Sequence, residues 1–130
     1  MNLEIGKTIT SAQLKECEHI STFGVYEIYL LNEDISFLFA IDNANLICSC
    51  FEFVDREDGI LLAHMHTLKS LKGQGIGKQI LREAVNIYTV FELPSTDNNK
   101  TYYFIEDGYG WIQHCFDIGI LTEPPFKRPE

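Results

Sequence analysis

Two histidines, His64 and His66, have the type and spacing for acid–base chemistry. They lie in the run of residues 60–67, whose apolar and β-branched character predicts a strand. Residues i and i+2 of a strand project from the same face, and imidazole groups change charge near neutral pH. The pair could act as a general base, or it could be two histidines hydrogen-bonded at the surface of a sheet.

A glycine-rich turn follows this strand, with the sequence Lys72-Gly73-Gln74-Gly75-Ile76-Gly77-Lys78. Glycine has no Cβ, so backbone N–H groups can approach a ligand closely, and the N-terminus of a following helix carries a partial positive charge. The turn therefore predicts an anion-binding site, with a plain strand-to-helix turn as the alternative. Its spacing matches neither the P-loop nor the dinucleotide-binding fingerprint, so neither nucleotide fold is expected.

Hydrophobic periodicity predicts the elements that would position these residues. Thr10 and Gln13 have the spacing of a capping box, which predicts a helix over residues 11–20. Runs of β-branched and aromatic residues, separated by short polar turns, predict four strands joined as an antiparallel meander. These strands are expected at residues 25–30, 35–40, 46–54 and 60–67.

The chain after the glycine turn shows helical spacing first. Apolar residues recur every three or four positions from Ile76 to Tyr88, which predicts an amphipathic helix. Beyond this helix we expect a further strand over residues 90–93 and a weaker one over residues 111–121. Between them a short helix is expected over residues 99–106, stopping at Gly108, because glycine suits a left-handed helix exit.

Length and composition favour one ordinary globular domain. The chain has 130 residues, of which 45% are hydrophobic and 22% charged, a balance typical of a protein with a folded core. We therefore expect a single domain over residues 1–130 that combines helices and strands. The sequence has neither a secretory leader pattern nor a run of about 18 apolar residues, so a cytoplasmic location is expected.

The acidic excess restricts the partners. The 10 Lys and Arg against 19 Asp and Glu give a formal net charge of −9, which would repel nucleic acid and anionic membranes and favours cationic partners. The four cysteines have the spacing of neither a secreted disulfide framework nor a zinc knuckle. Reduced thiols and no metal ion are therefore expected.

The glycine turn resembles the pyrophosphate-binding loop of the GNAT superfamily of N-acetyltransferases, Arg/Gln-x-x-Gly-x-Gly/Ala, with Lys72 in place of the Arg or Gln. Residues 103–109 are similar to the superfamily's Phe-Tyr-x-x-x-Gly-Phe segment, and residues 63–68 are similar to the paired-histidine strand of arylalkylamine N-acetyltransferases. The resemblance covers residues 60–110. It implies a mixed, mostly antiparallel central sheet flanked by helices, splayed between the strands before and after the helix that follows the turn.

The resemblance also implies a binding mode for acetyl-CoA as cosubstrate. The pantetheine arm would pair with the backbone of Met65 and Thr67, and Asn98 would contact coenzyme A. The diphosphate would lie on the N–H groups of residues 73–78, with the two lysines of the turn adding positive charge.

Such an enzyme needs a base, because an ammonium group must lose a proton before it attacks a thioester. His64 and His66 are the leading candidates, and Glu92, across the implied splay, is an alternative. Two acidic residues before the histidine strand, Glu57 and Asp58, are further alternatives.

The acid that protonates the departing thiolate is harder to place. The superfamily carries a tyrosine where this chain has Phe104, which leaves its neighbour Tyr103 as the candidate, with Tyr102 beside it. On a helix, neighbouring side chains point about 100° apart, so a shift of one residue changes what a tyrosine reaches.

The resemblance implies transfer of an acetyl group from acetyl-CoA to a primary amine by direct attack. The acceptor would be a small molecule or a protein lysine, and a homodimer is also expected because many superfamily members dimerise. The alternative is a non-catalytic acyl-CoA-binding or protein-interaction module with a degenerate active site, which the phenylalanine at position 104 favours.

Overall fold

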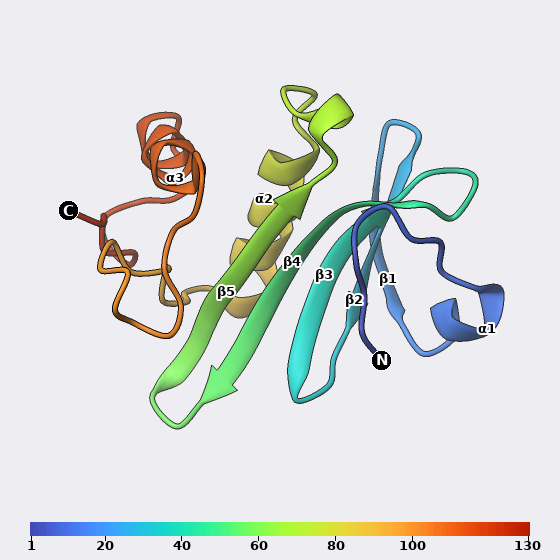
Figure 1. The fold of residues 1–130 in the computed structure, drawn as a ribbon, viewed down its shortest axis with the longest axis horizontal. Coiled ribbons are helices and arrows are strands. Elements are labelled where there is room, and N and C mark those ends of the chain that lie inside the picture. The colour runs from blue at the N-terminus through green and yellow to red at the C-terminus, as the bar shows by residue number, and fades with distance from the viewer.

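The computed structural model describes residues 1–130 as an α+β fold with one five-stranded antiparallel sheet and three α-helices (Figure 1). The strand order in the sheet is the chain order, so the predicted meander is confirmed. No helix is long and apolar enough to span a membrane. The elements in chain order are α1 (Ser11–Leu14), β1 (Glu18–Phe23), β2 (Tyr26–Leu31), β3 (Ile35–Ile41), β4 (Ile47–Arg56), β5 (Gly59–Thr67), the 3-10 helix η1 (Lys69–Leu71), α2 (Ile76–Tyr88) and α3 (Gly108–Asp117).

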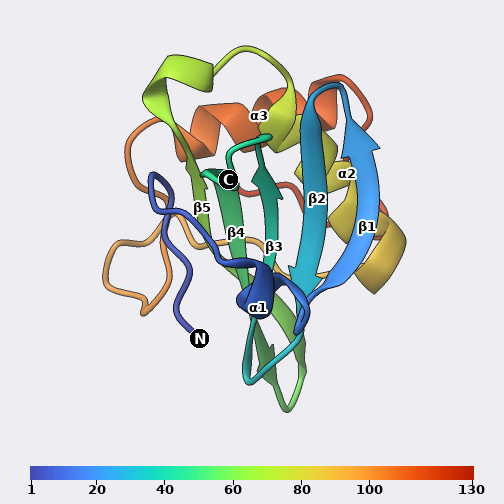
Figure 2. The same ribbon diagram turned by 90° about the vertical axis from the view of Figure 1, so that its right-hand side faces the viewer.

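Both faces of the sheet are covered, so its central strands are buried on both sides. Figure 2 shows α1 and the N-terminal segment on one face and α2 and α3 on the other. In β3, Leu38 and Ala40 belong to the core beneath the helices, whereas Phe37, Phe39 and Ile41 belong to the core beneath the N-terminal segment. The two cores follow from the two-residue alternation of side chains along a strand.

The N-terminal helix is shorter than predicted. The capping box is present, since the Thr10 N–H donates to Gln13 Oε1 at 2.9 Å and the Gln13 N–H donates to Thr10 Oγ1 at 3.1 Å. The helix ends at Leu14, however, and β1 begins at Glu18, so the helix predicted over residues 11–20 is wrong in its second half. Pairing with β2 across the turn at Gly24 outweighs the helical spacing of the apolar residues.

The C-terminal third was also predicted incorrectly. Residues 99–106 contain no helix, and residues 111–121, predicted as a strand, largely form α3. Ile112 and Cys115 are fully buried and lie three residues apart, which is the spacing of one helix face. Gly108 begins this helix, and Gly119, with φ 82°, takes the left-handed exit predicted for Gly108.

The helix predicted from Ile76 to Tyr88 is confirmed with these bounds, but the strand expected over residues 90–93 is reduced to one parallel bridge. The N–H of Glu92 donates to the carbonyl of Ile60, and the N–H of Leu62 donates to the carbonyl of Glu92, each at 2.8 Å. Beyond this point the chain leaves β5, and Ser95 pairs with Tyr103 instead. A backbone segment thus touches β5 at one place only and then turns away from it.

Replacing Phe91 tests how firmly this segment is docked. Its ring packs 5.3 Å from that of Phe53 and 4.9 Å from that of Phe126, measured between ring centroids. Phe91→Ala should lower the free energy of unfolding by about 3–5 kcal/mol, because it leaves a cavity among these rings. Val90→Ala, at a site 44% exposed, should change it by less than about 1 kcal/mol. Urea unfolding measures both values, and an equally small loss of unfolding free energy in the two variants would contradict the docking.

Candidate functional site

A cavity of about 570 Å³, here the site cavity, lies against the second half of β5. The glycine turn, the start of α2, the segment before α3 and α3 itself form its other walls. In Figure 1, α3 and the segment before it lie beside β5 on the side away from β4. The cavity brings together most of the residues expected from the sequence, namely His64, Met65, His66, Thr67, Lys72, Gly73, Gly75, Ile76, Gly77, Lys78 and Tyr103.

One wall of the site cavity is the outer edge of β5. The N–H of Leu68 donates to the carbonyl of Cys48 at 2.8 Å, and Ser49 Oγ donates to the carbonyl of His66 at 3.1 Å, so these groups face β4. Backbone groups alternate in direction along an antiparallel strand. The N–H and C=O groups of Met65 and Thr67 therefore point away from β4, toward the side where the site cavity lies.

The side chains of β5 divide between its two faces. Met65 and Thr67 face the helices, where Gly108 and Gly77 approach them closely. His64 and His66 are exposed on the other face, with their rings stacked 5.8 Å apart at 18°. The His64 ring also meets Tyr102 edge-on at 5.8 Å between centroids. The two imidazoles thus sit together at the border of the cavity and make no side-chain hydrogen bond with another residue of the chain.

The three glycines of the turn meet two different structural requirements. Gly73 and Gly75 adopt φ of 89° and 84°, a left-handed conformation in which other residues are strained. Gly77 is helical, and a Cβ placed there would lie 3.3 Å from Cζ2 of Trp111 and 3.5 Å from Oγ1 of Thr67. Gly77 therefore allows the first turn of α2 to pack closely against β5 and α3.

The start of α2 leaves backbone donors free. Gly75 is its N-cap and offers no side-chain oxygen, and the first N–H bonded within the helix is that of Gln79, which donates to the Gly75 carbonyl at 3.0 Å. The first N–H groups of a helix have no partner inside it and carry its positive dipole end. The N–H groups of Ile76, Gly77 and Lys78 are thus available beside the cavity.

Charge at the cavity is mixed. Lys72 Nζ lies 3.9 Å from Glu106 Oε2 and 3.8 Å from Asp107 Oδ1, so the turn and the segment before α3 are joined across the cavity by an ion-pair contact. Both carboxylates are highly exposed, and such surface pairs are worth about 0–1 kcal/mol. An anionic ligand that uses Lys72 would compete with these two carboxylates.

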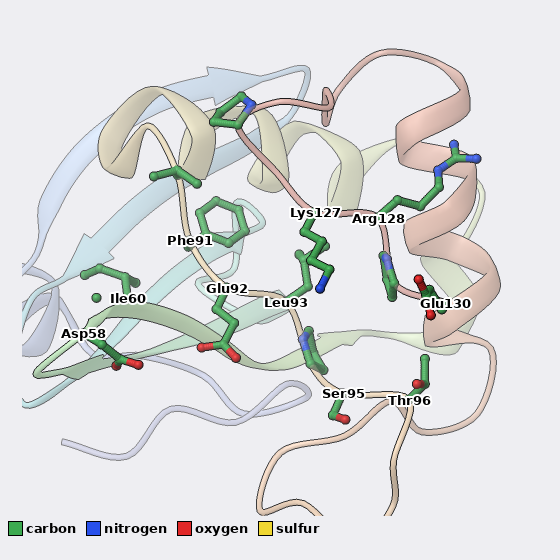
Figure 3. A pocket seen from close by; sticks show the side chains of 15 residues that line it. Asp58, Ile60, Phe91, Glu92, Leu93, Ser95, Thr96, Lys127, Arg128 and Glu130 are labelled. Atoms are coloured by element: carbon green, nitrogen blue, oxygen red, sulfur yellow. The ribbon is translucent and has the colours of Figure 1, made fainter.

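Glu92, Asn98 and Gln74 lie outside the site cavity, as do the alternatives Glu57, Asp58 and Tyr102. Glu92 forms an ion pair with Arg56 and lines a second cavity, of about 540 Å³, together with Asp58 (Figure 3). Asn98 lies in the loop before residue 100 and lines neither cavity. Gln74 points toward β2, where its Oε1 accepts from the Tyr26 hydroxyl at 3.4 Å.

Sequence reasoning missed two residues of α3 that line the site cavity, Trp111 and His114. It treated their segment as a strand, so their positions beside the glycine turn could not be expected. The spacing of Ile112 and Cys115 was the available signal for a helix.

Burial raises the pKa of all four cysteine thiols. Burial, with the charge of Glu52 adding to it, raises the pKa of the Cys50 thiol to about 12. Burial likewise raises the pKa of Cys115 to about 11, although nearby Lys78 and Arg82 oppose it. Thiolate is the reactive form of cysteine, so these two thiols are chemically quiet in the folded protein.

No protein-family model, no curated protein and no solved structure matches this chain. The class that the coordinates define is therefore the α+β fold described above.

Gly77 and Gly110 provide a matched test of the packing around the site. Gly77→Ala should destabilise the protein by about 1–3 kcal/mol, because the new Cβ meets Trp111 at 3.3 Å. Gly110, inside α3, has no atom within 4 Å of a new Cβ and no positive φ, so Gly110→Ala should stabilise it by about 0.5–1 kcal/mol. Thermal unfolding measures both, and the same sign for the two variants would contradict this packing.

Proposed function

We propose that this protein is an N-acetyltransferase that binds acetyl-CoA in the site cavity and transfers the acetyl group to a primary amine. The observation that carries the proposal is the placement of two kinds of free backbone groups on one cavity. The outward-facing groups of Met65 and Thr67 lie along one wall, and the glycine turn opens α2 at the other. These are the two features that the resemblance to the GNAT superfamily requires.

The chemistry of coenzyme A suits this arrangement. Its pantetheine arm carries amide groups, which can hydrogen-bond to the outward N–H and C=O groups of Met65 and Thr67 as a neighbouring strand would. Its diphosphate is an anion, which the free N–H groups at the start of α2 can bind. Lys72 and Lys78, which both line the cavity, add positive charge for the phosphates.

The reaction requires a proton acceptor and a proton donor. The amine must lose a proton, its nitrogen attacks the thioester carbonyl, the C–S bond breaks, and the thiolate takes up a proton. His64 and His66 are proposed as the base, and Tyr103 as the acid, because all three border the same cavity. Glu92 is a weaker candidate, since it is paired with Arg56 in the second cavity.

One observation favours the alternative, a module that binds acyl-CoA without turnover. Neither the His64 ring nor the His66 ring donates a hydrogen bond to a carboxylate or a carbonyl oxygen; the two rings contact each other and Tyr102 instead, whereas catalytic bases are commonly oriented by such an acceptor. A binding module would keep the affinity for coenzyme A and transfer nothing.

Coenzyme A binding tests the cavity assignment. Lys72→Ala should weaken binding by about tenfold, because one charge-assisted contact to a phosphate is lost. Lys100→Ala, outside the cavity, should leave the affinity unchanged. Calorimetry or the emission of Trp111, the only tryptophan, measures the affinity.

A second variant, Gly75→Val, should abolish binding by filling the turn. Undiminished affinity in a folded Gly75→Val protein would overturn the proposal.

Acetyl transfer tests the chemistry. Replacing the functional histidine, His64→Gln or His66→Gln, should lower kcat by about 10²–10⁴ at neutral pH while coenzyme A affinity changes little. His19→Gln is the control, because His19 contacts Glu27 on β1 and β2, away from the cavity. Turnover of labelled acetyl-CoA with a panel of amines is the measurement. Binding of acetyl-CoA without transfer to any amine would favour the binding module.

A further inference from the structure

The second cavity, here the tail groove, lies between residues 90–96 and the chain segment 125–130. Figure 3 shows Asp58 and Glu92 at one end and Lys127, Arg128 and Glu130 toward the other. Pro94 is the one residue that lines both the tail groove and the site cavity. The tail groove therefore adjoins the site cavity at this residue.

The tail groove is bordered by an extended backbone segment whose outer edge has no hydrogen-bond partners within the chain. Both backbone groups of Glu92 bond to β5, through Ile60 and Leu62. Because backbone direction alternates along an extended segment, the groups of Phe91 and Leu93 point the opposite way. No N–H or C=O of these two residues forms a hydrogen bond within the chain, although Phe91 is only 4% exposed. Both residues line the tail groove, so an extended segment that lies in the groove could pair with these backbone groups.

The spacing of the free groups fits an extended polypeptide. Phe91 and Leu93 are about 6.6 Å apart along the segment, which is the repeat of alternate residues in a neighbouring strand. The ladder stops there, because Pro94 has no N–H and the N–H of Ser95 already donates to the Tyr102 carbonyl. Up to four backbone hydrogen bonds are available, each worth about 0.5–1.5 kcal/mol. So short a ladder suits a transiently bound substrate and not a permanent subunit interface.

The charges of the tail groove also leave positions for a partner. Asp58 and Glu92 share one cation, Arg56, which leaves an excess negative charge at their end. Lys127 makes no ion pair and no hydrogen bond. A polypeptide with a cationic residue beside Asp58 and Glu92 would be complementary to this end of the groove, whereas Lys127 and Glu130 together leave the other end without a net charge.

We infer that the acceptor is an extended, lysine-containing segment of a polypeptide that pairs as a strand with Phe91 and Leu93 in the tail groove. The inference rests on the proposed acetyl transfer and names its substrate class. The lysine amine of the segment, reaching past Pro94 into the site cavity, would be the nucleophile. Its nitrogen gains the acetyl group and loses a proton, and coenzyme A leaves as the thiol.

A pair of N-methylated peptides tests the strand pairing without changing the protein. The probe is a capped hexapeptide of alternating threonine and valine with one lysine, offered with acetyl-CoA. Amide N–H groups of alternate residues face opposite sides of a strand, so methylation of one alternate set should weaken binding at least tenfold and methylation of the other set should not. Fluorescence anisotropy measures binding, and mass spectrometry measures acetylation.

A matched pair of variants tests the same edge from the protein side. Leu93→Pro removes one N–H that faces the groove and leaves both bonds of Glu92 to β5, so KM for the peptide should rise at least tenfold. Leu93→Ala retains the N–H and should change this KM little. Neither substitution should change the affinity for coenzyme A or the turnover of small amines. An unchanged peptide KM in folded Leu93→Pro protein would overturn the inference.

The remaining outcomes separate the inference from the proposed function. If the protein acetylated small amines but bound the two methylated peptides equally well, the inference would be overturned and the proposed function would stand. If only one of the two methylated peptides bound weakly but no amine was acetylated, both the acceptor assignment and the proposed function would be overturned. A dimer in solution that Leu93→Pro dissociates would overturn the inference in favour of a second copy of this chain on the same edge.

Discussion

Two hydrogen bonds, from Glu92 to Ile60 and from Leu62 to Glu92, determine the layout of both cavities. They attach the segment after α2 to β5 at a single point. Past that point the segment moves away, so β5 keeps an outward-facing backbone at Met65 and Thr67. On the opposite side of the segment the backbone of Phe91 and Leu93 is left without partners. A longer parallel pairing would have used up the groups that now border the site cavity.

The position of that single contact is maintained by packing. Phe91 lies three residues after the end of α2 and inserts its ring among Phe53, Tyr88 and Phe126, which belong to the sheet, the helix and the tail. Buried aromatic rings contribute large apolar areas, so this cluster holds the segment more strongly than two backbone bonds do. At the other end of α2, Gly77 allows a close approach to Trp111. Both ends of α2 are thus fixed by side-chain packing, and the cavity lies beside the start of this helix.

How much the sequence predicts depends on how local the deciding interactions are. The strands from β2 to β5 and helix α2 were predicted because alternation and helical spacing act within a few residues. β1 was missed because its pairing with β2 outweighed the helical spacing of Leu14 and Ile20. Except for Gln74, the predicted site residues between His64 and Lys78 lie together because they are neighbours in the chain. The positions of Glu92 and Asn98 depend on the path of loops that the sequence pattern does not describe.

The net charge of −9 illustrates the same limit for electrostatics. Taken alone, it argues against nucleic acid and anionic membranes as partners, yet the start of α2 presents free N–H groups to a cavity that the cations Lys72 and Lys78 also line. Charges are screened over about 10 Å at 0.1 M salt, so a ligand responds to the groups within that distance and much less to the total. Here the local groups include Glu106 and Asp107, which lie beside Lys72. The balance between these carboxylates and the helix start, and not the overall charge, decides how strongly an anion is held.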